Sequence, residues 1–507
     1  MTGPALTPDE ERPDKPNADA KAQEPALALC RDVSRGTLHL RDQGRTYLFQ
    51  APGEINADYD IRLSRSVLFN AFARTIKGLA GMVFRRDPVL EDDVPAKIAG
   101  DYENIDLAGT HGDVFLRRLC EDSLEAGHAL ILVDYPDLGG RVLPRDIEAS
   151  LGARPYWVHI KKDDIVSWRT ENVAGRTMLA QIVIREASME PKGKYGEAKV
   201  ERYRAFTRED GAVRFDVYRK VDDKIIPERS GIVANQERIP IAEVTTSGRR
   251  RLLVSDPPLL DLATINVAHY QTLSDQLNAL HKANSPILVI VGREMMSQEA
   301  QGEKVVVGPS WGLDLPQGAD AKYIEPTGAA LGASRTQLQD FETQMARLGL
   351  SMLQQETRAA ETAEAKRIDK SEGDSALSVT ARGLQDAIEL ALEFHARHRG
   401  LPEGGSVTIN RDFEELELTP DEVRMYSELV SSGQLSLDTM YAMLARGERL
   451  PEDFDPEAEK DKIAAGDMGR PQAPAAQGDA AMMGAGASAM AATDSAMMPA
   501  GGMNVGA

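Results

Sequence analysis

Apolar side chains recur at two different spacings along the chain, and the spacing predicts which segments are helices and which are strands. Between Ser64 and Phe84 they recur every three or four residues, which predicts an amphipathic helix on Phe69, Phe72, Ile76, Leu79 and Val83. Further along, short apolar or alternating runs predict strands, because successive side chains of a strand point to opposite faces. These runs are 129–133, 156–160, 181–184 and 213–217, and the last has the most regular alternation.

The helical spacing returns after Pro257 and Pro258. Residues 258–283 predict a helix roughly 40 Å long, with apolar residues at intervals of three and four. Two β-branched runs, Ile287–Val291 and Val305–Val307, then predict a compact pair of strands. The remaining predicted elements are helices at 334–354 and 377–391, a strand at 406–410, and short helices at 420–432 and 436–446.

Three segments lack such a pattern. Residues 1–30 hold five prolines and many charges, so a flexible arm without a secretory signal is expected there. From about residue 464 the chain turns to Ala, Gly, Met and Pro, which predicts a disordered tail over 464–507. Between two predicted helices, 355–374 is charged, and Ile368 is its only large aliphatic residue.

Charge and composition narrow the classes of function. The 507 residues include 59 basic and 80 acidic side chains, and 59 − 80 gives a net charge of −21. So acidic a chain is a poor candidate for a sequence-specific DNA binder, which neutralises phosphates with Lys and Arg. Its two cysteines, Cys30 and Cys120, cannot build a disulfide framework, which favours a reducing compartment. Nor is there an apolar run of about 18 residues, so no membrane span is expected.

One short motif suggests an enzyme. Gly308-Pro-Ser-Trp-Gly312 matches the G-x-S-x-G turn that presents a nucleophilic serine, here Ser310. Asp340 and His395 follow in the chain order that a hydrolase needs. However, the motif requires a helix after the serine, whereas Pro316 and Gly318 interrupt the residues that follow. A loop between strands is the favoured interpretation, and a serine hydrolase using Ser310 is kept as the alternative function.

Other candidate sites have simpler structural explanations. His395 and His398 are spaced for zinc binding, but no third ligand is recognisable, so a solvated helix end is expected instead. Asp134 and Asp137 follow an apolar strand as nucleotidase acids do, yet the phosphate-binding G-x-x-x-x-G-K-[ST] motif is absent. The run 249–251 is three arginines, which are expected in a solvated turn or against a neighbouring acidic subunit. No catalytic residue, metal site or cofactor is predicted.

The order of these segments, together with several local sequences, resembles the portal proteins of tailed double-stranded-DNA phages, the head-to-tail connectors. The local sequences resemble more specifically one portal-like group, formerly described as a domain of unknown function. The similar stretches span about residues 35–450, and they are Ser66–Pro88, Gly127–Pro136, Arg154–Trp157, Ile165–Trp168, Pro257–Tyr270 and Leu315–Gly328. None of these stretches is chemically diagnostic alone; their order carries the resemblance.

The resemblance implies an α+β, helix-rich fold in which each subunit contributes to a ring, usually of about twelve copies. By order along the chain, it implies these parts: an N-terminal arm (1–30), a wing (31–256), a first stem helix (257–283), a clip (284–331), a second stem helix (332–354), a tunnel loop (355–375), a long wing helix and strand (376–414), a crown (415–463) and the tail (464–507). The implied stem packing residues are Tyr270, Leu273, Leu277, Leu280, Phe341, Met345 and Leu348.

The resemblance also implies a function. A portal is a non-enzymatic ring at one capsid vertex of the virion, assembled in the bacterial host cytoplasm. It nucleates head assembly, passes the genome in and out, docks the terminase large subunit, and contacts the capsid or scaffolding protein and the head–tail adaptors. The tunnel-loop residues expected to touch the passing DNA are Arg358, Lys366, Arg367 and Lys370. Another head or tail-adaptor structural protein with similar segments is the third possibility.

Overall fold

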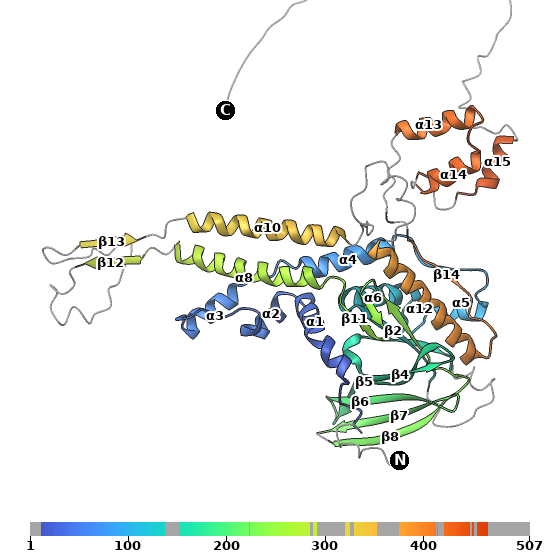
Figure 1. The fold of residues 1–507 in the computed structure, drawn as a ribbon, viewed down its shortest axis with the longest axis horizontal. Coiled ribbons are helices and arrows are strands. Elements are labelled where there is room, and N and C mark those ends of the chain that lie inside the picture. Colours follow the sequence, from blue (N-terminus) through green and yellow to red (C-terminus); the bar gives the residue numbers. More distant parts are fainter. Residues whose placement is uncertain are drawn as a thin grey trace, which may run out of the picture. The chain divides into compact units, whose positions relative to one another are not determined.

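A computed structural model describes residues 12–136, 152–222, 224–283, 287–291, 320–324, 329–351, 375–411, 413, 420–446, 449–450 and 454–464. The chain divides into two compact units, Met1–Phe413 and Glu414–Ala507 (Figure 1). The first unit contains α-helices, three two-stranded sheets, one three-stranded sheet and one five-stranded sheet among the described residues. The second contains helices only in its described part.

Helices form the start of the first unit. They are α1 (Ala18–Ser34), α2 (Thr37–Gln43), the 3₁₀ turn η1 (Gly44–Thr46), α3 (Asn56–Arg65) and α4 (Ala71–Val83). The flexible arm expected over 1–30 is therefore wrong from Ala18 onward. The Asn17 side chain caps α1 by accepting a hydrogen bond from the Ala20 amide at 2.8 Å. Pro25 lies inside α1, but buried side chains of the helix, Leu27 and Val33 among them, offset the backbone bond that proline removes.

Helix α4 begins later than its apolar spacing predicts. The Asn70 side chain accepts a hydrogen bond from the Ala73 amide at 2.9 Å, and this cap starts the helix at Ala71. Phe69 therefore precedes the helix and is 44% exposed, so its place on the predicted apolar face was wrong. The other four residues of that face, Phe72, Ile76, Leu79 and Val83, are buried as predicted.

A three-stranded antiparallel sheet lies at the centre of the first unit. Its order is β3 (Tyr156–Ile160), β2 (His128–Asp134) and β9 (Ile241–Thr245), which confirms the predicted strands at 129–133 and 156–160. Alternate residues of β2 enter different cores: Ile131 packs with the helices, and Leu132 packs with a second sheet. The helices on that sheet include α6 (Gly112–Ala126) and α12 (Ala376–Arg399), which confirms the helix predicted at 377–391. Helix α12 comes so close to β9 that a Cβ on Gly383 would meet the Thr245 carbonyl oxygen at 2.1 Å.

The second sheet is an antiparallel meander of five strands in chain order. Its strands are β4 (Ile165–Val173), β5 (Arg176–Lys192), β6 (Gly196–Glu209), β7 (Ala212–Val221) and β8 (Lys224–Val233). The predicted runs 181–184 and 213–217 lie inside β5 and β7. Trp168, Ile182 and Phe206 pack against the central sheet, so the first unit has successive layers of helices, sheet and meander.

Short elements complete the first unit: β1 (Val89–Leu90), α5 (Ala96–Tyr102), η2 (Lys162–Asp164), β10 (Arg249–Arg251), β11 (Val254–Ser255) and β14 (Val407–Thr408). Strand β14 pairs with β1, and it confirms the strand predicted at 406–410 over two residues. The second unit contains α13 (Pro420–Ser431), α14 (Leu437–Arg446) and α15 (Pro456–Ala464). The first two were predicted, and Tyr441 of α14 packs against Phe454 with ring centres 5.1 Å apart.

Candidate functional site

Two long helices lie side by side in the first unit, and a β-hairpin follows the first of them (Figure 1). They are α8 (Leu260–Ala283) and α10 (Ala329–Ser351), which confirms the helices predicted at 258–283 and 334–354. Strand β12 (Ile287–Val291) has the bounds of the predicted apolar run. It pairs antiparallel with β13 (Asp320–Ile324), a strand that the sequence pattern did not predict. The second predicted run, Val305–Val307, lies outside the described residues.

Buried polar groups fix the first half of α8 to the N-terminal helices. Asn266 is fully buried; its Oδ1 accepts from the Phe72 amide at 3.1 Å, and its Nδ2 donates to the Phe69 carbonyl at 2.8 Å. Tyr270 is also fully buried, and its hydroxyl shares a 2.7 Å hydrogen bond with Ser66 Oγ. Because each buried polar atom needs a partner, these bonds specify one position for α8 on the helices beneath it.

Helix α10 packs on α8 and on the hydrophobic core that the helices of the first unit share. Met345 is 2% exposed, Leu338 is 7% exposed, and Leu348 packs against the core from a half-buried position. Near its end, a Cβ on Gly349 would meet Thr75 of α4 at 3.2 Å, so a larger residue there would press against α4. His269 Nε2 lies 3.6 Å from Glu342 Oε1 across the two helices. Burial lowers the pKa of His269, although Glu342 opposes this effect, so the imidazole is neutral at pH 7.

Exposure rises along the rest of α8. Leu273 and Leu277 are half-buried, and Leu280 is 37% exposed. Of the seven residues proposed for stem packing, Tyr270 and Met345 are therefore buried within one chain, whereas Leu273, Leu277, Phe341 and Leu348 are only partly covered. In the hairpin beyond, Val291 is 53% exposed, and an isolated two-stranded sheet is at best marginally stable in water. The later part of α8 and the hairpin thus leave apolar side chains partly exposed within one chain.

Several candidate residues cannot be placed. Ser310, Asp137 and the four cations Arg358, Lys366, Arg367 and Lys370 lie outside the described residues. Asp340 lies on the exposed side of α10. Of the three residues of the hydrolase hypothesis, the structure thus describes Asp340 and His395 but not Ser310.

His395 is not part of a solvated helix end, as the sequence suggested, because it is completely buried. Its Nε2 shares a 2.9 Å hydrogen bond with Asp101 Oδ2, and the Arg399 Nε donates to the same oxygen at 2.7 Å. Arg154 Nε lies 3.5 Å from the other oxygen. Burial alone would raise the pKa of Asp101, but the hydrogen bonds from His395 and Arg399 outweigh burial and lower it. Among the described residues, no group of three or more His, Cys, Asp or Glu side chains suits a metal ion.

Asp101 therefore joins α5 to the end of α12, and its replacement by asparagine is expected to destabilise the first unit. Removing one partner of a buried ion pair costs about 3 kcal/mol, and here it would leave the buried His395 and the partly buried Arg399 and Arg154 without their carboxylate. The carboxylate of Asp101 contributes its stability fully above pH ~4 and loses it as pH falls through the lowered folded pKa. Thermal unfolding at pH 7 should give a clearly lower Tm for Asp101→Asn. Glu393→Gln is the control, since Glu393 pairs with Arg397 at the surface. Equal Tm values for the two variants would refute the structural role of Asp101.

The remaining charged candidates are paired within the chain. Asp134 Oδ2 accepts a 3.2 Å hydrogen bond from the Tyr156 hydroxyl and forms an ion pair with Arg204. The arginine run 249–251 forms β10, and its three guanidinium groups pair with Glu243, Asp256 and Asp19 in turn, at 3.1, 2.5 and 2.6 Å. The strand is exposed, but its charges are already balanced inside one subunit.

Part of this chain is similar to one protein family, and most of it is similar to several solved chains. The family described as "Domain of unknown function (DUF4055)" matches residues 258–399, which include α8, the hairpin, α10 and α12. No curated protein matches. Similar solved chains occur in the virion of a native gene transfer agent particle (12% identity, TM-score 0.39), in the neck of an empty particle computed with C6 symmetry (13%, 0.37) and in the neck of a native particle computed with C12 symmetry (12%, 0.37). Each match covers 74% of this chain and 89% of the other. Of the helices in the described residues, none is both long and apolar enough to cross a membrane.

Proposed function

We propose that this protein is the portal of a phage-like particle: a non-enzymatic ring at one capsid vertex through which DNA enters and leaves. The observation that carries the proposal is the pair of long helices α8 and α10, fixed at one end to an α/β core and bearing a β-hairpin between them in the chain. This order is the one implied by the portal resemblance for the stem, the clip and the stem again. The partly exposed apolar residues of the pair, Leu273, Leu277 and Leu280, would be covered by neighbouring subunits.

Net charge supports the same function. A subunit charge of −21, repeated around a ring, gives a mostly acidic surface. An acidic channel wall repels the phosphates of DNA, so that the duplex slides without sticking. Salt screens this field beyond about 8 Å, and the repulsion therefore acts only where the wall lies near the DNA. The partners expected in this role are further copies of the chain, terminase, the capsid or scaffolding protein and the adaptor proteins.

A ring of about twelve subunits has a mass that differs clearly from that of a monomer. Native mass spectrometry of the purified full-length protein should give one main species, close to twelve times the subunit mass of 55.3 kDa. A protein that stays monomeric across the concentrations tested would contradict the proposal. A closed ring without DNA translocation in particle assembly would instead favour another head or tail-adaptor protein.

The serine hydrolase alternative has its own test. Ser310→Ala is expected to leave phage production unchanged, apart from a mild effect on stability, because no catalytic role is assigned to this serine. His395, the base that such an enzyme would need, is buried and already bonded to Asp101. Hydrolysis of activated esters by the wild type, lost in Ser310→Ala, would show that the portal proposal misses an enzymatic function.

A further inference from the structure

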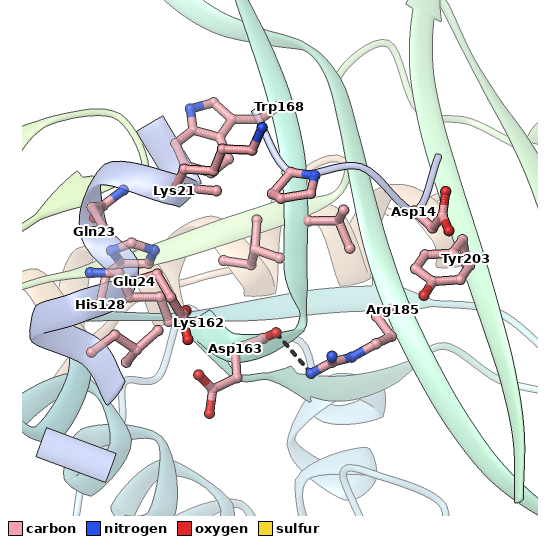
Figure 2. Close-up of a pocket in the computed structure, with 15 residues that line it drawn as sticks. Asp14, Lys21, Gln23, Glu24, His128, Lys162, Asp163, Trp168, Arg185 and Tyr203 are labelled. Atoms are coloured by element: carbon pink, nitrogen blue, oxygen red, sulfur yellow. Dashed lines mark hydrogen bonds between the residues drawn. The ribbon is translucent and has the colours of Figure 1, made fainter. Parts of the chain in front are cut away.

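A cavity of about 240 Å³ lies between α1 with its preceding segment and the near edge of the meander (Figure 2). One part of its lining is apolar and includes Leu27, Ile165 and Trp168. Another part is polar and includes His128 and Lys162, which come from β2 and η2. Pockets for drug-sized ligands run from about 300 to 1,000 Å³, so any occupant of this cavity must be small.

Lys162 is a buried cation whose charge no neighbouring carboxylate balances directly. Lys162 is 7% exposed, and its Nζ donates to the carbonyl oxygens of Ala126 at 2.8 Å and Ser255 at 2.9 Å. An ammonium group has three donors, so one donor remains after these two bonds. Within the described residues, Nζ has no carboxylate oxygen within 4.0 Å. Burial, the largest influence, lowers the pKa of Lys162 to about 8, although the charges of Asp256, Glu243 and Asp163 oppose this effect from a distance.

His128 supplies a second unused polar atom at the same place. It is 1% exposed, and its Nδ1 shares a 2.7 Å hydrogen bond with Ser255 Oγ. Its Nε2 is buried and has no hydrogen-bond partner among the described residues. Burial, and then the charges of Lys162 and Arg249, lower the pKa of His128 well below 6.5, so the ring is neutral. The hydrogen bond between Nδ1 and Ser255 Oγ can run in either direction; in the tautomer in which the hydroxyl donates to Nδ1, Nε2 carries the proton and is a donor.

The carboxylates that line the cavity are already paired with cations. Asp163 lies 2.8 Å from Arg31, Glu24 lies 3.6 Å from the same arginine, and Asp14 lies 2.9 Å from Arg12. These carboxylates thus have direct ion-pair partners, whereas the ammonium group of Lys162 has none among the described residues. Lys162 and His128 line the same cavity, and both bond to Ser255, Lys162 at its backbone carbonyl and His128 at its hydroxyl.

We propose that this cavity binds a small organic carboxylate. One carboxylate oxygen accepts from Lys162 and the other from His128, and the apolar body of the ligand lies against Leu27, Ile165 and Trp168. A bidentate, charge-assisted contact of this kind satisfies both orphan donors at once. A free phosphate would satisfy the donors but leave the apolar lining uncovered, which is why the ligand class is a carboxylate. The site is independent of the portal function.

The test uses the full-length protein with hexanoate as the probe. Calorimetry should show saturable binding, and thermal unfolding should show a Tm that rises with hexanoate concentration. Hexanol and inorganic phosphate, at the same concentrations and ionic strength, should do neither. Lys162→Gln should weaken hexanoate binding at least tenfold. Lys161→Gln is the matched control: Lys161 is the neighbouring lysine, is paired with Asp122 at 2.9 Å and does not line this cavity, so the variant should bind as the wild type does.

A second variant covers a failure of Lys162→Gln to fold. Ala20→Leu narrows the cavity from the α1 side without removing a polar group, and it should also weaken hexanoate binding. No binding of hexanoate by the wild type would overturn the proposal, as would equal binding of hexanol. Binding of phosphate in place of hexanoate would overturn the carboxylate class. Unchanged hexanoate affinity in a folded Lys162→Gln or Ala20→Leu variant would overturn the location.

Discussion

Replacing Leu348 or Leu273 by aspartate is expected to abolish ring formation while most of the α/β core stays folded. Leu348 packs against the core on the α10 side, and Leu273 is half-buried on α8. A carboxylate placed in such a contact costs about 3 kcal/mol or more, and a ring repeats that cost in every subunit. Native mass spectrometry should therefore show monomers in place of the ring, with a circular dichroism spectrum close to that of the wild type.

Gln344→Asp is the matched control for these variants. Gln344 lies on the exposed side of α10, next to the buried Met345. The substitution therefore introduces the same charge on the same helix without burying that charge. Its rings should form normally. Normal rings from both leucine variants would mean that α8 and α10 are not the stem of an assembly. Loss of rings in Gln344→Asp would mean that charge, and not packing, limits assembly.

The second large effect is expected from replacing residues 356–374, which lie outside the described residues, by a Gly/Ser segment. This stretch carries ten charged side chains between α10 and α12, and it is the proposed tunnel loop, with Arg358, Lys366, Arg367 and Lys370 as the residues that touch phosphate. A Gly/Ser replacement that ends before Ser375 keeps the cap of α12, where the Ser375 hydroxyl accepts from the Ser378 amide. We expect normal rings and normal empty heads, but few stably filled heads.

Filled and empty heads of the variant and the wild type are counted by electron microscopy, and the DNA that the heads retain is measured. Each phosphate contact needs to be weak, since a tight contact would stop the DNA from moving. A Gly/Ser replacement at the turn 193–195 between β5 and β6 is the control, and it should leave packaging unchanged. Full packaging and retention by the 356–374 variant would show that the tunnel loop lies elsewhere or that this stretch is only a solvated linker.

The sequence predicted an element correctly where the hydrophobic pattern of that segment alone determines its secondary structure. Helix α8 and strand β2 carry long or wholly apolar repeats, and their predicted positions were confirmed within two or three residues. Strand β13 (Asp320–Ile324) has a weak pattern of its own and forms by pairing with β12. Helix α1 was missed because the five prolines of residues 1–30, of which only Pro25 lies inside the helix, outweighed its cap and its buried residues in the prediction.

The candidate sites bring together residues that are far apart in the chain, and local sequence patterns do not connect such residues. The partner of His395 is Asp101, which lies 294 residues away in the chain, so no local spacing could reveal that the histidine is buried and bonded. Lys162 and His128 both bond to Ser255, but the three residues belong to different elements. Local spacing could therefore not reveal this arrangement either. A buried amide in an apolar helix, such as Asn266 in α8, was a signal available in the sequence and was not used.

Electron microscopy of the purified full-length protein tests the central claim most directly. The portal proposal predicts closed rings with a central hole, in which α8 and α10 of successive copies surround the hole. Monodisperse monomers would contradict it, and monomers with esterase activity that depends on Ser310 would replace it with the hydrolase.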